Sequence, residues 1–316
     1  MKMSGIGIIT NPHSKLNRRR PDRQKLLGYI VGERGKLELT NSLEDLARVA
    51  ESFRERGIEV LAINGGDGTV SRTLTAFIRA YQGSALPKVL ILRGGTINVL
   101  AENLRLQGSP EAILVRYLES ISLVRPSTIQ RIRCISIDNN YGFLFGNGLV
   151  ANYLEAFYLN KTGPVGAVML VIKIYFWRLF QYERFLSIVN ERIYDLKLDG
   201  AQVQLHGVCT SVIMASTIER MPLGLKLFPY ARRSPGQFQV FWLEIPVKQI
   251  ALRLLAALTF NQLGKRFGRV NRLVKDLTIE TKDEKLQKYT LDGELFSAAS
   301  GKLKLTLGPE IEFIVV

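Results

Sequence analysis

The first part of the chain alternates short apolar runs with segments of helical spacing. Buried strands are predicted for three apolar runs, SGIGIIT, IEVLAIN and KVLIL. Helices are predicted from the cap Ser42 to Gly57, from Val70 to Gly83, and from the cap Ser109 onward. Strands that alternate with helices in this way predict a doubly wound, mostly parallel α/β sheet.

The pattern changes after about residue 125, where strand-like runs follow one another at short intervals. A hairpin is predicted for RIRCISID and YGFLFGN, with its turn at Asn139-Asn140. Asp199-Gly200 is a strong two-residue hairpin signal between LKL and AQVQL. Further strands are predicted for VCTSVIMAS, GQFQVFWL, DLTIET, KYTL, ELF and KLKLTL, with helical stretches at about 150–182 and 246–260.

These two patterns predict two domains with a cleft between them, where ligands usually bind. An α/β domain is expected over residues 1–125. A mainly antiparallel, sandwich-like β domain is expected over residues 126–316. An alternative within this division is that the final strand or strands of the chain return to the first domain.

The net charge of the chain indicates which classes of binding partner are favoured. The 316 residues include 43 Lys and Arg against 28 Asp and Glu, which gives a net charge of +15. Such an excess favours polyanions: nucleic acid, an anionic membrane surface or phosphorylated small molecules. The sequence has no aromatic-rich RNA-recognition pattern, zinc-finger spacing or basic zipper, so we expect no nucleic-acid partner.

Cysteine and histidine usage indicates no metal site built on those residues. Cys134 and Cys209 lack metal-ligand spacing, and His13 and His206 are too few. Buried thiols in a reducing compartment are expected instead. The apolar run at the N-terminus is too short for a signal peptide, and the most hydrophobic stretch, PVGAVMLVIKIYFWRLF, contains a Lys and an Arg. A cytoplasmic location is therefore expected.

A glycine-rich loop, NGGDGT, joins the second predicted strand to a helix at Asn64–Thr69. Three glycines beside a helix N-terminus expose backbone N–H groups in a phosphate-binding geometry. The loop is neither GxxxxGK[ST] nor GxGxxG. Asp67 would repel a bare phosphate, so its presence favours a metal–nucleotide complex. The alternative is a solvent-facing turn that uses Asp as a turn former.

GGDGT resembles the signature of the diacylglycerol kinase, sphingosine kinase and ceramide kinase family, and of the wider superfamily with NAD kinases and phosphofructokinases. Three more segments agree in order and spacing. Asn11–Ser14 resembles NPxSG, Gly95–Asn98 resembles GTxN at the start of a helix, and Leu291–Glu294 resembles the DGE segment. Thr40 matches a threonine of the family. The resemblance spans essentially the whole chain and looks most like the soluble bacterial branch.

The resemblance implies an NAD kinase-like fold and a lipid kinase that depends on ATP and Mg²⁺. Its γ-phosphate acceptor would be the hydroxyl of a diacylglycerol-like or sphingoid/ceramide-like membrane lipid. Asp67 would be a metal ligand through nucleotide-bound Mg²⁺. The nucleotide contacts carry over to Asn11, Ser14, Thr40, Gly65, Gly66, Asp67, Gly68, Thr69, Gly95, Thr96 and Asn98.

The same resemblance implies Asp292 as the proton acceptor, with Glu294 holding metal or orienting the site. In the sphingosine kinase branch that role belongs to the aspartate of the glycine loop, here Asp67. We favour Asp292, because an Asp67 pressed against phosphates and metal would be held ionised as a ligand. The alternative is a plain hairpin turn, as at Asp199-Gly200.

Several positions depart from the family pattern. Lys15 replaces the second glycine of NPxSG, Arg93 replaces a proline before GTxN, and Val99 replaces an acid after it. In some Gram-positive members, acids in a later loop hold a structural Mg²⁺, which we predict to be absent here. That loop has Arg232, Arg233, Ser234 and Pro235 instead, so the arginines either face a membrane or form an exposed hairpin tip.

A lipid substrate implies work at a membrane surface, so peripheral association with an anionic membrane is expected. Val165–Phe180 would line an acyl-chain pocket, touch the interface or form an ordinary core helix. The competing functions are an NAD kinase-like enzyme and a non-catalytic nucleotide- or lipid-binding protein that retains the fold. The lipid and the oligomeric state stay open, with a homodimer among the options.

Overall fold

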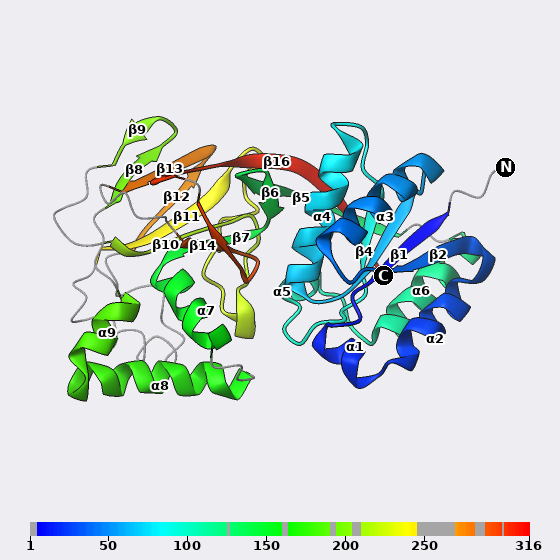
Figure 1. Ribbon diagram of the computed structural model, residues 1–316. Coiled ribbons are helices and arrows are strands. Elements are labelled where there is room, and N and C mark those ends of the chain that lie inside the picture. Colours follow the sequence, from blue (N-terminus) through cyan, green and yellow to red (C-terminus); the bar gives the residue numbers. More distant parts are fainter. Residues whose placement is uncertain are drawn as a thin grey trace.

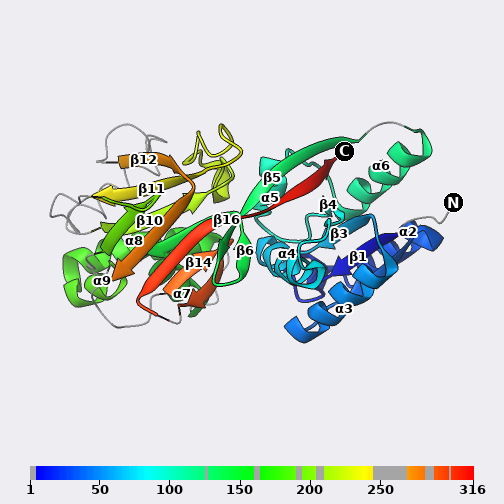
Figure 2. The same cartoon turned by 90° about the horizontal axis from the view of Figure 1, so that it is seen from above.

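The computed structural model describes residues 5–124, 127–159, 164–189, 194–203, 210–244, 269–281, 288–298 and 300–316. The helix expected at 246–260, Cys209 and His206 lie outside these residues. The chain forms an α/β half and a β-rich half that lie side by side (Figure 1). Seen from above, a long two-stranded ribbon connects the two halves (Figure 2).

The α/β half is built on a parallel sheet in the order β2-β1-β3-β4. One face of the sheet packs against α3, α4 and α5, with Phe53 and Phe77 in the core. The opposite face packs against α2 and α6 through Leu27 and Ile113. The elements are β1 (Ile6–Thr10), α1 (Lys15–Arg19), α2 (Asp22–Val31), a 3₁₀ turn (Gly32–Arg34), β2 (Gly35–Leu39), α3 (Leu43–Arg56), β3 (Val60–Asn64), α4 (Asp67–Tyr81), β4 (Lys88–Ile91), α5 (Val99–Asn103) and α6 (Pro110–Ser122).

The β-rich half contains a second, antiparallel sheet in the order β12-β11-β10-β7-β14-β15. One face packs on β8, β13 and the start of β16 through a buried apolar cluster that includes Trp242 and Ile279. The other face packs on three helices, with Phe185 and Phe241 in that core. The elements are β7 (Leu144–Gly148), α7 (Leu149–Leu159), α8 (Pro164–Phe180), α9 (Tyr182–Val189), β8 (Tyr194–Leu198), β9 (Ala201–Gln202), β10 (Thr210–Ser216), a 3₁₀ turn (Pro222–Gly224), β11 (Phe238–Glu244), β12 (Arg269–Val274), β13 (Asp276–Thr281), β14 (Lys288–Leu291) and β15 (Glu294–Ser297).

The connecting ribbon consists of β5 (Thr128–Ile137) and β16 (Lys302–Val315), which pair antiparallel. The start of β16 pairs with β13 in the β-rich half, and Phe313 near its end pairs parallel with Val89 of β4. A register shift between Leu307 and Glu310 marks a bulge. A Cβ on Gly308 would lie 2.7 Å from the sulfur of buried Cys134, so the bulge requires glycine there. One strand therefore belongs to both halves.

The predicted fold class is confirmed: an α/β parallel domain precedes a mainly antiparallel β domain. The capped helix after Ser42 and the Asp199-Gly200 hairpin also form as predicted, with positive φ values of 51° and 79° in the turn. None of the helices in the described ranges is long and apolar enough to cross a membrane.

Four local predictions differ from the structure in position or extent. The helix expected from Val70 already begins at Asp67, inside the glycine loop. The β5 hairpin turns at Asp138-Asn139, because Ile137 pairs with Asn140. The run YGFLFGN is not one strand, because it breaks at Phe143 between β6 (Asn140–Gly142) in the first sheet and β7 in the second. The helix expected at 150–182 is divided into α7 and α8.

The shared strand β16 gives a stability prediction. Phe313 is fully buried in the α/β core and contacts Phe143 edge-on, so Phe313→Ala should lower the free energy of unfolding by about 3–5 kcal/mol. Urea denaturation followed by circular dichroism measures this loss. Val316→Ala, at the partly exposed end of the chain, is the control and should cost less than about 1 kcal/mol. Equal losses in the two variants would contradict the shared-strand core.

Candidate active site

The candidate site begins at the carboxyl edge of the parallel sheet. The chain passes from β1 to β2 on one side, whereas β3 lies on the other side of β1. Such a switch point is where open α/β sheets usually bind ligands. The loop after β1 starts at Asn11, and β3 ends at Asn64. The Asn11 N–H donates to the Asn64 carbonyl at 3.1 Å.

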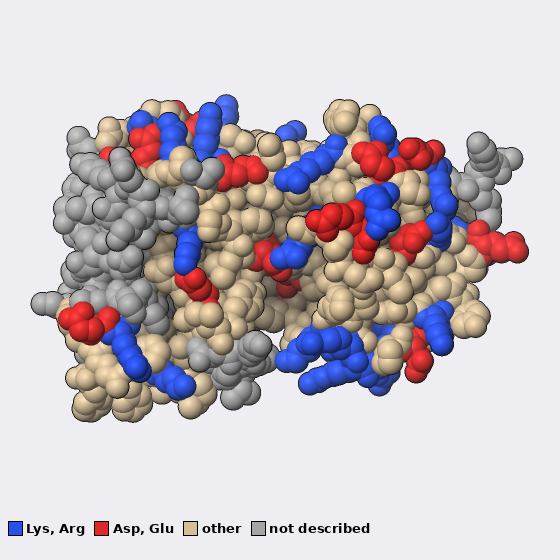
Figure 3. Space-filling view, in the orientation of Figure 1, with Lys and Arg blue, Asp and Glu red and all other residues tan. Residues whose placement is uncertain are grey.

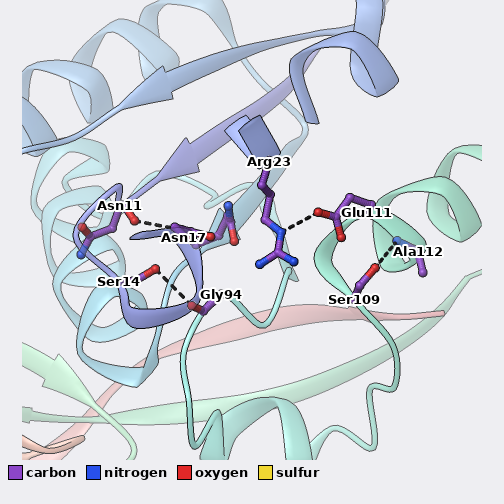
Figure 4. A network of polar contacts seen from close by, with 9 residues as sticks. Asn11, Ser14, Asn17, Arg23, Gly94, Ser109, Glu111 and Ala112 are labelled. Carbon is purple, nitrogen blue, oxygen red and sulfur yellow. Dashed lines mark hydrogen bonds and ion pairs between the residues drawn. The ribbon is translucent and has the colours of Figure 1, made fainter. Parts of the chain in front are cut away.

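Polar side chains tie the loop after β1 to the loops after β3 and β4. The Asn11 amide donates to the Thr69 hydroxyl at 2.9 Å, and the Ser14 hydroxyl donates to the Gly94 carbonyl at 3.1 Å. Asn17, in the first turn of α1, donates its side-chain amide to the Asn11 carbonyl at 2.9 Å. Figure 4 shows Asn11, Ser14 and Asn17 together on this loop, with Ser14 directed toward Gly94. Asn11 and Ser14 thus hold three loops in fixed positions.

The two glycine-containing loops lie backbone against backbone. A Cβ on Gly95 would lie 2.3 Å from the Cα of Gly66, and a Cβ on Gly94 would lie 2.7 Å from the Gly65 nitrogen. Asn98 has a left-handed φ of 53°, and its side chain accepts from the Gly95 N–H and donates to the Gly95 carbonyl. The glycines are therefore needed for this close packing, a role that the sequence did not reveal.

The N-terminus of α4 is the point where the two halves meet. Gly66 is its N-cap, so the N–H groups of the first turn lack helical acceptors. A Cβ on Gly68 would lie 1.9 Å from a carboxylate oxygen of Glu294. Glycine at position 68 therefore leaves room for the Glu294 side chain, which joins GGDGT to the DGE segment.

Asp67 binds the start of another helix. Its carboxylate accepts from the Leu100 N–H at 3.2 Å and from the Val99 N–H, the first residues of α5. Burial raises the pKa of Asp67, while these hydrogen bonds lower it. The positive end of the α5 dipole thus partly offsets the negative charge of the Asp67 carboxylate, which would otherwise repel a phosphate.

Asp292 occupies the turn between β14 and β15 and also caps a break in another strand. Asp292 and Gly293 have positive φ values of 50° and 84°, so this is a tight hairpin turn. The carboxylate accepts from the N–H groups of Phe143, at 3.0 Å and 3.1 Å, and Leu144, at 2.8 Å, where β6 ends and β7 begins. Asp292 is therefore both a hairpin-turn residue and a carboxylate with specific backbone partners.

The electrostatic surroundings of Asp292 are unusual for a carboxylate. Burial raises the pKa of Asp292 from 3.8 to about 7, against the lowering effect of its hydrogen bonds to Phe143 and Leu144. The negative charge of Asp67 raises the pKa further. A carboxyl group with such a pKa can gain or lose a proton near neutral pH.

Side chains of α4 contact the β5–β6 hairpin and the DGE turn of the β-rich half. Arg72 forms an ion pair with Glu294, and the Ser71 hydroxyl donates to the Tyr141 carbonyl at 2.8 Å. Tyr158 of α7 donates to the Gly293 carbonyl at 2.6 Å and so holds the turn from its other side. Sequence reasoning missed Arg72 and Tyr158, since no local pattern pairs either residue with a turn so far along the chain.

The predicted nucleotide-binding residues follow the ends of β1, β2, β3 and β4, at this edge of the sheet. Thr40 lies at the end of β2, where its N–H donates to the Thr10 carbonyl. Thr96 is exposed on the loop after β4. The Thr10 hydroxyl and the Asn64 side-chain amide are buried without a hydrogen-bond partner among the described residues. Sequence reasoning did not include Asn64 among the nucleotide-binding residues, although its position directly before Gly65 and Gly66 could have indicated it.

The possible metal ligands are engaged with protein groups. Asp67 and Asp292 accept backbone N–H groups, and Glu294 pairs with Arg72. Within the described part of the chain, no three His, Cys, Asp or Glu residues are grouped closely enough to hold a metal ion. In the loop at 232–235, Arg232 donates to Gln130 at 3.1 Å and Arg233 stacks over the Tyr230 ring.

Comparison with known proteins finds a family match for the first part of the chain and solved structures that share the fold of the whole chain. The model of the diacylglycerol kinase catalytic domain matches residues 6–131, whereas no curated protein matches the chain. A candidate diacylglycerol kinase from Bacillus anthracis str. Sterne has a similar crystal structure, with a TM-score of 0.72 and 15% identity over 99% of this chain and 95% of that one. A second candidate from the same strain has a TM-score of 0.71 and 16% identity, with 100% of both chains covered. At this identity the structures show a shared fold.

A third structure, a diacylglycerol kinase from the same strain, has a TM-score of 0.64 and 14% identity over 100% of this chain and 98% of that one. The common fold spans both halves of the chain, and the family match covers the glycine loop and the loop after β4. Residues 6–131 therefore match the diacylglycerol kinase catalytic domain, and both halves of the chain share the fold of these solved structures.

Proposed function

We propose that this protein transfers the γ-phosphate of ATP to the hydroxyl group of a membrane lipid. One observation carries the proposal: the DGE turn of the β-rich half lies on the first turn of α4. The Glu294 side chain lies against Gly68. Asp292, two residues before Glu294, has a pKa of about 7. A helix N-terminus suited to phosphate thus lies next to a carboxylate suited to accept a proton.

The nucleotide is expected at the switch point between β1 and β3. The free N–H groups of the first turn of α4 would bind phosphate oxygens, and the hydroxyls of Ser14 and Thr96 would add hydrogen bonds. The unpartnered buried groups of Thr10 and Asn64 would be satisfied by the ligand or by water that it holds in place. Lys15, which begins α1 directly after Ser14, adds positive charge at this edge.

Mg²⁺ fits this site as an ion that arrives with the nucleotide. It usually binds phosphates and waters together with one or two carboxylates, and here Asp67 and Glu294 are the carboxylates available to it. Bound Mg²⁺ would neutralise charge on the transferred phosphoryl group. The N–H groups of α5 and Arg72, which bind these carboxylates in the structure, keep them in place until then.

Asp292 is the proposed proton acceptor. As the lipid oxygen bonds to the γ-phosphorus and the bond to the ADP oxygen breaks, the hydroxyl proton would pass to the Asp292 carboxylate. Asp67 is less suited, because as a ligand of nucleotide-bound Mg²⁺ its carboxylate would be held ionised. The backbone donors of Phe143 and Leu144 would keep Asp292 oriented during the transfer.

A membrane-docking face is proposed along the lower edge of the molecule in Figure 1, where α8 and α1 lie. Leu159 and Phe180 are 79% and 78% exposed at the ends of α7 and α8. Figure 3 shows Lys and Arg side chains gathered over α1, which contains Lys15, Arg18 and Arg19. Apolar side chains together with basic ones favour peripheral binding to an anionic bilayer, from which the lipid would enter.

The kinase assay tests the proposal directly. With γ-labelled ATP, Mg²⁺ and mixed micelles of diacylglycerol, ceramide and sphingosine, label should enter the lipid fraction. Asp292→Asn should lower kcat about 10²- to 10⁴-fold, because the amide keeps a hydrogen-bond acceptor but takes up no proton. Asp199→Asn is the matched control, because Asp199 also lies in an Asp-Gly turn and its carboxylate also accepts backbone N–H groups. This variant should keep full activity.

Two results of this assay would contradict the proposal. Label that never enters lipid while ATP still binds would favour a non-catalytic binding protein. Label that appears on added NAD would favour an NAD kinase-like enzyme. Full activity of Asp292→Asn would remove only the assignment of the proton acceptor.

The raised pKa of Asp292 predicts the pH dependence. Because the base must be ionised, kcat/KM should rise about tenfold per pH unit up to about pH 7 and then level off. Stability should change in the opposite direction. The folded protein binds this proton more tightly than the unfolded chain, so the stabilisation is complete below about pH 4 and lost as pH rises through about 7.

Kinetic profiles and thermal unfolding between pH 4 and 9 measure both trends. Asp292→Asn should remove the loss of stability between about pH 4 and 7, and its residual activity should lack the slope. Asp199→Asn should keep both trends. An activity profile for the native protein that is flat between pH 5 and 8 would contradict a base with a pKa of about 7.

The docking face predicts weaker membrane binding when its apolar residues are replaced. Leu159→Ser with Phe180→Ser should reduce sedimentation with anionic phosphatidylglycerol vesicles about tenfold or more, since two side chains lose their burial in lipid. Leu123→Ser, at an exposed position after α6, is the control and should bind as the native protein does. Equal losses in both variants would contradict a localised docking face.

A further inference from the structure

A second polar site lies on the connecting ribbon, formed by residues outside the α4 site. It is a crevice of about 100 Å³ where β5 and β16 meet two loops of the β-rich half. The polar residues that line it include Arg131, Arg133, Thr217, Arg232, Ser234 and Gln237. The volume exceeds the roughly 30 Å³ that one water molecule occupies, so a small oxyanion fits.

Positive charge exceeds negative charge around the crevice. Three guanidinium groups line it, against the single carboxylate of Glu310. Arg131 is shared between Glu312, at 2.8 Å, and Glu310, at 3.8 Å. Among the described residues, Arg232 donates only to the neutral Gln130 side chain, and Arg133 forms no ion pair. Two arginines therefore carry charge that no described carboxylate offsets.

The wall of the crevice contains an unsatisfied polar group. Thr217 is only 4% exposed, and its hydroxyl has no hydrogen-bond partner within the described part of the chain. Buried hydroxyl groups are normally hydrogen-bonded, so this one indicates a missing partner. Because Thr217 lines the crevice, a ligand there can supply that partner.

We propose that this crevice binds a phosphate group, either free inorganic phosphate or the phosphomonoester headgroup of a lipid. Arg133 and Arg232 would pair with its oxygens, and Thr217 would donate its hydroxyl proton to one of them. A cation is disfavoured by the three arginines.

The site would act on the junction between the halves. Glu310 follows the bulge of β16, where that strand passes from one half to the other. Thr217 and Arg232 belong to the loops between β10 and β11 in the β-rich half. A bound phosphate would therefore attach these loops to the connecting ribbon. The proposal does not depend on the proposed kinase activity.

Thermal unfolding with increasing phosphate, up to about 10 mM, tests the proposal. Phosphate should raise the Tm of the native protein by about 2 °C or more, relative to chloride of equal ionic strength. Arg133→Ala with Arg232→Ala should abolish the shift. Arg233→Ala is the matched control, since Arg233 lies next to Arg232 but stacks on Tyr230, and it should keep the shift. Thr217→Val preserves shape and should weaken phosphate binding, measured by calorimetry, about tenfold.

Vesicle binding distinguishes the two sources of phosphate. If a lipid headgroup occupies the crevice, the double arginine variant should lose a preference for phosphatidic acid vesicles over phosphatidylglycerol vesicles. If free phosphate occupies it, the variant should lose only the response to inorganic phosphate. A native protein without either response would overturn the proposal, as would phosphate binding that the double arginine variant retains.

Discussion

The contact between the Asp292 carboxylate and the N–H groups of Phe143 and Leu144 is the interaction on which the site depends. At that point the chain leaves the first sheet and enters the second. The carboxylate replaces the acceptors that a continuous strand would supply, so the break is satisfied. The same contact fixes the hairpin turn that places Glu294 over Gly68. A single side chain therefore joins the strand break to the candidate active site.

Helix α4 gives this arrangement its geometry. Its first turn contains the end of the glycine loop, and Arg72 pairs with Glu294 of the β-rich half. Ser71 and Arg79 bind the β5–β6 hairpin, which leads into that half. Orientation between the halves is thus set by direct contacts of one helix as well as by the ribbon of β5 and β16. A motion that separated the halves would have to break these contacts, and a nucleotide at the start of α4 would bind beside the Arg72–Glu294 ion pair.

Local signals in the sequence predicted local structure well. Ser42 and Gly57 bounded α3, and Asp199-Gly200 formed its turn, because capping and turn chemistry act within a few residues. The approach of Gly66 to Gly95 and the binding of Asp67 to the start of α5 could not be predicted, since they depend on how distant loops pack. The motifs identified residues that lie at the same edge of the sheet. They did not indicate that several of these residues form hydrogen bonds with one another, as Asn11 does with Thr69.

The central claim is that Asp292, held at the strand break, titrates near neutral pH. Carbon-13 NMR of aspartate-labelled protein, with Asp292→Asn to assign the resonance, measures this pKa without any substrate. The account predicts a midpoint at about pH 7, caused by burial and the charge of Asp67. A midpoint near the ordinary value of 3.8 would contradict it and would leave Asp292 as a turn residue and strand cap alone.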